Sequence, residues 1–125
     1  MAHTGLRAGE ARSLRWRHID LSDRMAITLP AEITKSRRTQ VIPLSKRSLH
    51  AIPALRESDD SPSGPVFGAL DDKTLRRDLH RCGVRIEDER GLSSGFHSFR
   101  KYYATALARA GVDPMQIQKL MRHAN

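Results

Sequence analysis

Residues 96–123 read FHSFRKYYATALARAGVDPMQIQKLMRH, and this stretch predicts two helices separated by a short turn. An apolar stripe at helical spacing marks the first helix, from Phe96 to Ala110, and Gly111 suits the position just past its end. Asp113 is suited to cap the second helix, with Pro114 at its first position. The expected apolar faces are Phe99, Tyr103, Ala106, Leu107 and Ala110 in the first helix, and Ile117, Leu120 and Met121 in the second.

The middle of the chain predicts a β-hairpin followed by short helices. Residues 25–29 and 39–44 favour strands, and the polar, basic residues 34–38 lie between them, a pattern typical of two antiparallel strands. Ser45 is suited to cap a helix that runs towards Glu57, with a kink or early end at Pro53. Asp71 or Asp72 is suited to cap a further helix, which contains Leu75, Leu79 and Cys82 and ends at Gly83.

A short helix over residues 8–16 and loops over residues 58–65 and 87–95 complete the prediction. The expected fold class is α+β, mostly helical, with a small antiparallel β-hairpin or sheet. The length of 125 residues fits one domain, 1–125.

Composition favours a polyanionic partner. Hydrophobic residues make up 38% of the chain, enough for a core, and the formal net charge is +8. Such an excess favours nucleic acid, although a basic protein without that partner stays an alternative. Cys82 is the only cysteine, which excludes a disulfide within the chain and favours a reducing, intracellular setting. We see neither a signal peptide nor the run of about 20 apolar residues that a membrane span needs.

Arginine and histidine pairs at helical spacing are the candidate chemistry. Arg7 and Glu10 lie three residues apart at one predicted helix start, and His97 and Arg100 repeat that spacing at another. Residues at this spacing share a face, and the free N–H groups of a helix N-terminus favour an anion. Two arginine forks and a histidine could bind one phosphodiester and stabilise its five-coordinate transition state, with Glu10 orienting Arg7 or a neighbour. Each pair alone is also typical of a solvated helix surface, as is Lys35 in its basic loop.

Four segments, in order, resemble the motifs of the tyrosine recombinase (phage integrase) family. Residues 4–11, TGLRAGEA, with 14–16 and 19–20, resemble the first arginine box, and residues 34–35 with 41–44 resemble the hairpin that carries the catalytic lysine. Residues 97–100, HSFR, with 104–105 and 111–113, resemble the second arginine box, and residues 117–123 resemble the segment of the second histidine. Each motif is weak alone, but the ordered set spans nearly the whole chain.

The resemblance implies a role for each matched position. Arg7 and Arg100 would bind the non-bridging oxygens of the scissile phosphate. Lys35 would donate a proton to the leaving 5′-hydroxyl, His97 would assist proton transfer, and His123 would hydrogen-bond the phosphate or help the nucleophile. Such enzymes recombine or integrate DNA through a 3′-phosphotyrosine intermediate and use neither metal nor nucleotide cofactor. The implied partners are double-stranded DNA and other recombinase subunits, without a membrane, and the implied location is cytoplasmic, at the nucleoid.

Two departures from the family pattern matter. Arg122 stands where the family usually has a glycine, which puts the local backbone and phosphate contacts in question. The family's nucleophilic tyrosine lies about one helical segment beyond the second histidine, and no tyrosine follows His123 here. We therefore expect a truncated catalytic domain, inactive alone, without the N-terminal DNA-clamp domain and the C-terminal tyrosine segment. Tyr102 and Tyr103 are interpreted as core or helix-surface residues.

Two other interpretations stay open. Residues 104–120 contain a helix, a glycine-containing turn and a second helix, as in a helix-turn-helix DNA-binding module. Alternatively, the chain is an integrase remnant that binds DNA or partner chains without cutting. A tyrosine in the downstream reading frame would argue against the remnant. Spatial convergence of the five matched positions would argue against the simple module: Arg7, Lys35, His97, Arg100 and His123.

Overall fold

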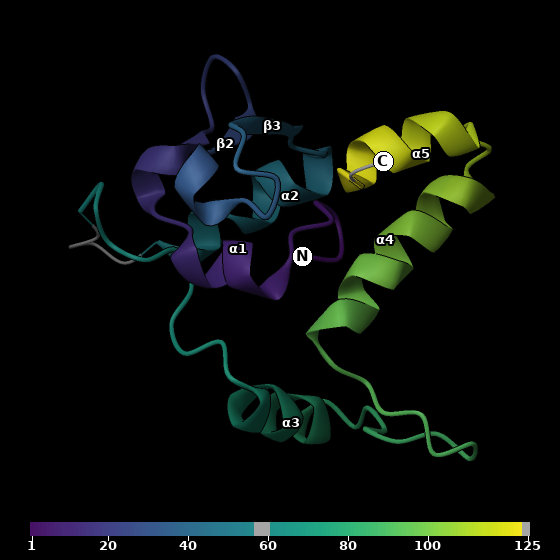
Figure 1. Cartoon of the computed structure of the whole chain (residues 1–125). Coiled ribbons are helices and arrows are strands. Elements are labelled where there is room, and N and C mark those ends of the chain that lie inside the picture. The colour runs from purple at the N-terminus through teal and green to yellow at the C-terminus, as the bar shows by residue number, and fades with distance from the viewer. Residues whose placement is uncertain (57–60, 124–125) are drawn as a thin grey trace.

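The computed structural model describes residues 1–56 and 61–123 and combines a small sheet with helices (Figure 1). Its three strands form one antiparallel sheet in the order β1-β2-β3, in which Ile27 pairs with both Ile19 and Ile42. The predicted hairpin is therefore confirmed, and β1 is an additional strand. The elements, with η for 3-10 helices, are α1 (Ala8–Ser13), η1 (Trp16–His18), β1 (Ile19–Asp20), β2 (Ala26–Leu29), η2 (Ala31–Ile33), β3 (Gln40–Pro43), α2 (Lys46–Ala51), η3 (Pro53–Leu55), α3 (Asp72–Arg81), α4 (Phe96–Arg109) and α5 (Pro114–Met121).

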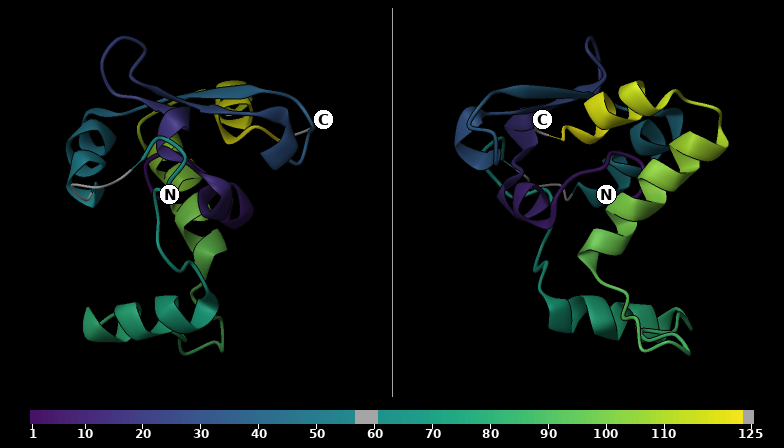
Figure 2. Two further views of the ribbon diagram at one scale, coloured as in Figure 1. Left: turned by 90° about the vertical axis from the view of Figure 1, so that its left-hand side faces the viewer. Right: turned by 45° about the vertical axis from the view of Figure 1, so that its right-hand side comes forward.

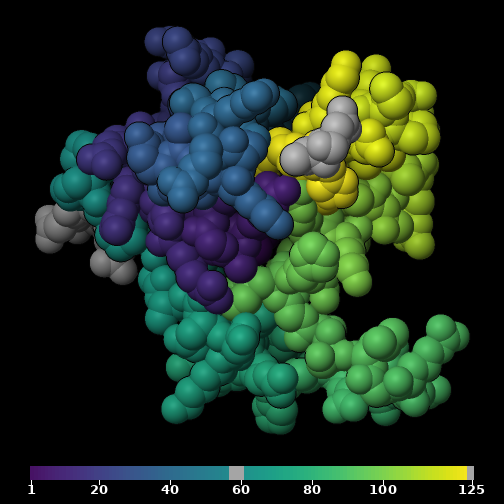
Figure 3. Space-filling view, viewed as in Figure 1, coloured from purple at the N-terminus to yellow at the C-terminus, as the bar shows by residue number. Residues whose placement is uncertain are grey.

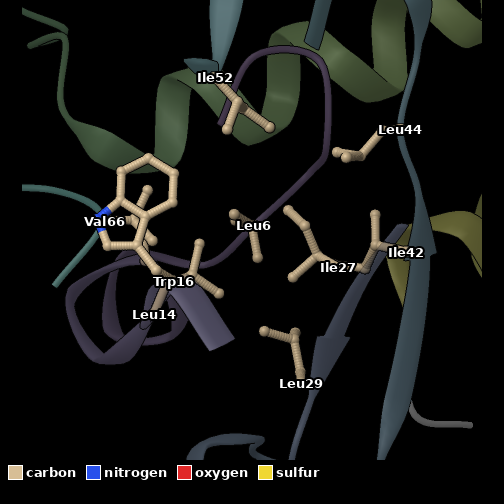
Figure 4. Close-up of a cluster of buried hydrophobic side chains, with 10 residues drawn as sticks. Leu6, Leu14, Trp16, Ile27, Leu29, Ile42, Leu44, Ile52 and Val66 are labelled. Atoms are coloured by element: carbon tan, nitrogen blue, oxygen red, sulfur yellow. The ribbon is translucent and has the colours of Figure 1, made fainter. Parts of the chain in front are cut away.

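The apolar core lies between the sheet, α1 and α2. Side chains from the first 66 residues meet there, as Figure 4 shows, and Leu6, Leu14 and Ile27 are each only 1% exposed. Burial of one such side chain contributes about 1.5–3 kcal/mol to stability. The core thus fixes the positions of the segments that lead into the candidate site. Its members are Leu6, Ala11, Leu14, Trp16, Ile27, Leu29, Ile42, Leu44, Ile52 and Val66.

The first helix is shorter than predicted. It ends at Ser13 instead of Trp16, which lies in η1 with its side chain in the core. A strand-like pairing takes over after the helix: the N–H of Val66 donates to the carbonyl of Leu14 at 3.1 Å, and the N–H of Trp16 donates to that of Gly64 at 3.2 Å. Tertiary pairing has therefore overridden local helix propensity.

The middle helices begin where their caps predict. The Ser45 side chain accepts from the N–H of Ser48 at 3.2 Å, and Asp71 accepts from that of Thr74 at 2.7 Å. The first of these helices ends before Pro53, which confirms the early end. The expected continuation to Glu57 and part of the predicted loop 58–65 lie outside the described residues.

The C-terminal pair of helices lies against the sheet side of the molecule. α4 runs diagonally along one side of the molecule, and α5 turns back from its end towards β3 (Figures 1 and 2). Asp113 caps α5 through the N–H of Met115 at 2.8 Å, as predicted. Ala106 and Ala110 are exposed, which corrects the predicted stripe, because α4 is covered on one side only. No helix among the described residues is long and apolar enough to cross a membrane.

α3 stands apart from the core. Figure 3 shows α3 and the loop after it projecting from the rest of the molecule. The loop over residues 87–95 agrees with the prediction and is held by an isolated pairing of Glu87 with Ser93.

Candidate functional site

A buried carboxylate, Glu10, lies at the centre of the candidate site. Its side chain is 2% exposed, and Oε1 accepts from Arg7 Nη1 at 3.1 Å. Oε2 accepts from the backbone N–H of Arg7 at 2.9 Å and from Arg122 Nη2 at 2.7 Å. A buried carboxylate requires such partners, because an unpaired charge away from water is very costly. Glu10 thus fixes two guanidiniums from opposite ends of the chain.

The three arginines of the site also donate hydrogen bonds to backbone carbonyls. Arg7 Nη2 donates to the carbonyl of Arg122 at 3.1 Å, and Arg122 Nη2 donates to that of Gly5 at 3.0 Å. Arg100 is buried; its Nη1 donates to the Gly5 carbonyl and its Nη2 to the Met121 carbonyl. These bonds join the segment before α1, the first half of α4 and the end of α5.

The cluster carries excess positive charge. Three guanidiniums, those of Arg7, Arg100 and Arg122, surround the single carboxylate of Glu10, which leaves a surplus of two positive charges. Burial, followed by the charges of Arg7 and Arg122, lowers the pKa of Arg100 to about 10, and Glu10 offsets part of this effect. Burial also lowers the pKa of Arg122. An added anion would relieve the mutual repulsion of these cations.

Of the two candidate histidines, His123 is the one whose electrostatic neighbours include Arg100 and Arg7. His123 follows α5 and is exposed, and His97 is exposed in the first turn of α4. Partial desolvation lowers the pKa of His123, and the charges of Arg100, Arg7 and His97 lower it further. The lowered pKa favours the neutral form of His123, whose ring can donate one hydrogen bond and accept another.

The candidate lysine lies on a projecting loop. Lys35 is exposed between η2 and β3, in the loop that stands away from the sheet in Figures 1 and 2. Thr34 Oγ1 donates to the carbonyl of Arg38 at 2.8 Å and closes the base of this loop. Within the described part of the chain, no ion pair joins Lys35 to the cluster.

A groove nevertheless connects this loop with the end of α5. It has a volume of about 720 Å³ and is lined by Ser36, Arg38, Gln40, Val41, Lys119, Arg122 and His123. The structure therefore joins Arg7 and Arg100 to the end of α5, where His123 follows, and the hairpin lies beside that end. His97 lines a separate pocket with residues of α3, among them Asp72 and Arg76.

Sequence reasoning missed the contact between Arg122 and Glu10. The arginine was visible as a departure from the family pattern, but the two residues are 112 positions apart and no local spacing connects them. The Gly5 carbonyl, which accepts from two arginines, was missed for the same reason.

Comparison with known proteins identifies the family. Residues 1–125 match the phage integrase family along their whole length. This chain belongs to the phage integrase family. It is 28% identical to the integrase of Shigella phage Sf6 over 127 residues, covering 100% of this chain and 32% of that protein. It is 34% identical to the prophage integrase IntZ of Escherichia coli (strain K12) over 109 residues, covering 86% of this chain and 26% of that protein. The chain thus spans about a third or less of these relatives.

Solved structures share the fold. The integrase from mycobacterium phage Brujita has a TM-score of 0.72 and 27% identity, covering 98% of this chain and 40% of its own. XerA recombinase has a TM-score of 0.75 and 24% identity, and the match covers 99% of this chain and 45% of the recombinase chain. The catalytic domain of bacteriophage HP1 integrase has a TM-score of 0.67 and 18% identity, and the match covers 99% of this chain and 64% of that domain's chain. The predicted fold, an α+β catalytic domain of the tyrosine recombinase type, is confirmed.

Proposed function

We propose that this chain supplies the phosphate-binding centre of an enzyme for site-specific DNA recombination or integration. The observation that carries the proposal is the convergence of Arg7, Arg100 and His123, from three distant segments, on one cluster with excess positive charge. Arginine forks match the geometry of phosphate oxygens, and the net charge of +8 favours a polyanionic substrate.

The proposed reaction breaks and rejoins DNA through a 3′-phosphotyrosine. A tyrosine oxygen attacks the scissile phosphorus, and the bond from phosphorus to the 5′-oxygen breaks. Arg7 and Arg100 bind the non-bridging oxygens and stabilise the transition-state charge. Lys35 gives its proton to the leaving 5′-oxygen, His97 assists proton transfer, and neutral His123 hydrogen-bonds the phosphate or accepts the tyrosine proton. Since one phosphoester replaces another, the exchange requires no nucleotide cofactor, and none is proposed.

We propose that the attacking tyrosine lies outside residues 1–125. Tyr103 is half-buried against Gly5, and burial raises the pKa of its hydroxyl. Tyr102 is exposed two residues after Arg100 on the same helix, so it faces a different direction. Neither side chain is suited to in-line attack on a phosphate bound by that arginine.

The proposed substrate is double-stranded DNA of a phage or another mobile element. The Tn1549 transposon integrase, which has this fold with a TM-score of 0.68 and 18% identity, was solved in complex with a circular intermediate DNA. By analogy, we propose that other recombinase subunits share the DNA and that the protein works in the cytoplasm, at the nucleoid.

The alternative of a simple helix-turn-helix module has less support. The last turn of α5 is held by Arg7 and Arg100 through the carbonyls of Arg122 and Met121. A simple DNA-reading module has no need for such an arginine cluster. A non-catalytic remnant with the same DNA affinity stays an alternative.

The first test is binding of a short DNA duplex, measured by fluorescence anisotropy at two salt concentrations. We expect affinity to fall steeply with salt, because lysine and arginine contacts release counterions. Arg7→Lys should weaken binding about tenfold through loss of a bidentate fork. Arg109→Lys, at the exposed end of α4, is the matched control and should have no effect. Absence of binding at low salt, or equal losses in both variants, would contradict the proposal.

A further inference from the structure

Arg122 has a backbone conformation that strains most residues. It caps the end of α5 with φ 54° and ψ 42°, in the left-handed region where glycine is preferred. Its side chain is also 7% exposed, so its charge has lost most of its water. Arg37 has a similar φ of 55° but is exposed in the hairpin loop. Position 122 therefore combines backbone strain with desolvation.

Arg122 uses its donors unevenly. Nη2 donates to both Glu10 Oε2 and the Gly5 carbonyl, at 2.7 Å and 3.0 Å. Nε and Nη1 are buried and have no hydrogen-bond partner among the described residues. A half-satisfied buried cation is a poor source of stability. Fold stability alone therefore does not account for this side chain.

Arg122 contacts one end of the Arg7 guanidinium directly and the other end through Glu10. Its backbone carbonyl accepts from Arg7 Nη2 at 3.1 Å. Its guanidinium binds Glu10 Oε2, while Oε1 accepts from Arg7 Nη1 at 3.1 Å. Arginine and carboxylate groups favour a closed, bidentate pair when neither has another partner. Such a pair between Arg7 and Glu10 would occupy both ends of the fork.

We propose that Arg122 is a positioning residue that prevents this closed pair. Together with the backbone N–H of Arg7, its guanidinium occupies Oε2 and so keeps Glu10 on one end of the Arg7 guanidinium. Its carbonyl accepts from the other end. The remaining N–H groups of Arg7 then stay available for a phosphate oxygen. This inference rests on the proposed function, because it concerns the same phosphate site.

A double-mutant cycle tests whether Arg122 acts through Glu10. Arg122→Asn removes the guanidinium and keeps a residue that tolerates left-handed backbone. We expect it to weaken binding of a short DNA duplex about tenfold in the otherwise unchanged chain. In the Glu10→Gln background, the same change should weaken binding less than about twofold, because the carboxylate that closes on Arg7 is gone. Arg109→Gln, which removes one exposed charge from the end of α4, should have the same small effect in both backgrounds.

Equal losses from Arg122→Asn in both backgrounds would overturn the proposal, because Arg122 would then act by charge or by direct contact. Absence of any loss would also overturn it. If Arg122→Asn does not fold, as judged by circular dichroism, Arg122→Lys replaces it in the cycle. A lysine keeps the charge but not the planar fork, so we expect a smaller loss that again disappears in the Glu10→Gln background.

A second measurement separates this inference from the proposed function. If the unchanged chain does not bind duplex DNA at low salt, the proposed function fails. The NMR signal of the Arg7 Nε–H group then decides the inference. We expect this signal to shift in Arg122→Asn and to return towards its original position in Arg122→Lys. An unchanged signal in Arg122→Asn would overturn the positioning role.

Discussion

Gly5 is packed closely against Tyr103, and its replacement by alanine tests that packing. Its φ is +62°, and an added Cβ would lie 2.8 Å from Tyr103 Cδ1 and 3.5 Å from Met121 Sδ. The left-handed backbone costs alanine about 1–2 kcal/mol. Overpacking against a half-buried ring adds about 1–3 kcal/mol. We therefore expect Gly5→Ala to lower the free energy of unfolding by about 2–5 kcal/mol.

Gly111 supplies the matched control. Its φ is +78°, but nothing lies within 4 Å of an added Cβ, so Gly111→Ala should cost only the backbone strain. Urea denaturation followed by circular dichroism measures both losses. In a Tyr103→Ala background, the loss from Gly5→Ala should fall to that of the control. Equal losses for Gly5→Ala and Gly111→Ala in the unchanged chain would refute the reasoning.

Three further outcomes are expected. Arg37→Gly should raise the free energy of unfolding by about 1 kcal/mol, because φ is +55° at this exposed residue; a loss of stability in urea would contradict this. In an NMR titration, His123 should have a midpoint below 6.5. The unfolded chain then takes up the proton first, so stability should decline as pH falls below about 6.5 and less so in His123→Asn; a midpoint above 6.5 would argue against this. On a nicked suicide duplex, residues 1–125 should form no covalent DNA adduct in a denaturing gel; an adduct that Tyr102→Phe or Tyr103→Phe abolishes would show that the nucleophile is misassigned.

Short-range features could be predicted from the sequence. The caps at Ser45, Asp71 and Asp113 each depend on a side chain and a backbone N–H two or three residues away. The same holds for the pair of Arg7 and Glu10, three positions apart. Such contacts depend little on the rest of the fold, which is why local patterns identified them.

Long-range features could not be predicted in this way. η1 replaces the end of the predicted first helix because residues 64–66 pair with the chain there. β1 has only two residues, Ile19 and Asp20, too few for an alternating pattern. The family motifs indicated that Arg7 and Arg100 share a site, but not that Arg100 donates to the carbonyls of Gly5 and Met121. Every residue has a backbone carbonyl, so residue types do not indicate which carbonyl accepts a hydrogen bond from a distant side chain.

The uneven distribution of apolar contacts has a consequence for local unfolding. The core cluster lies entirely within residues 6–66, whereas α4 and α5 bury only Phe96, Arg100 and Met121. Segments with few buried apolar contacts open at lower free energy than the core. Hydrogen exchange should therefore be faster in α4 and α5 than in β2, and uniform protection would contradict this. The proposed phosphate site at Arg100 exists only while α4 and α5 are folded against the rest of the chain. A short DNA duplex that binds there should therefore slow hydrogen exchange in α4 and α5 far more than in β2.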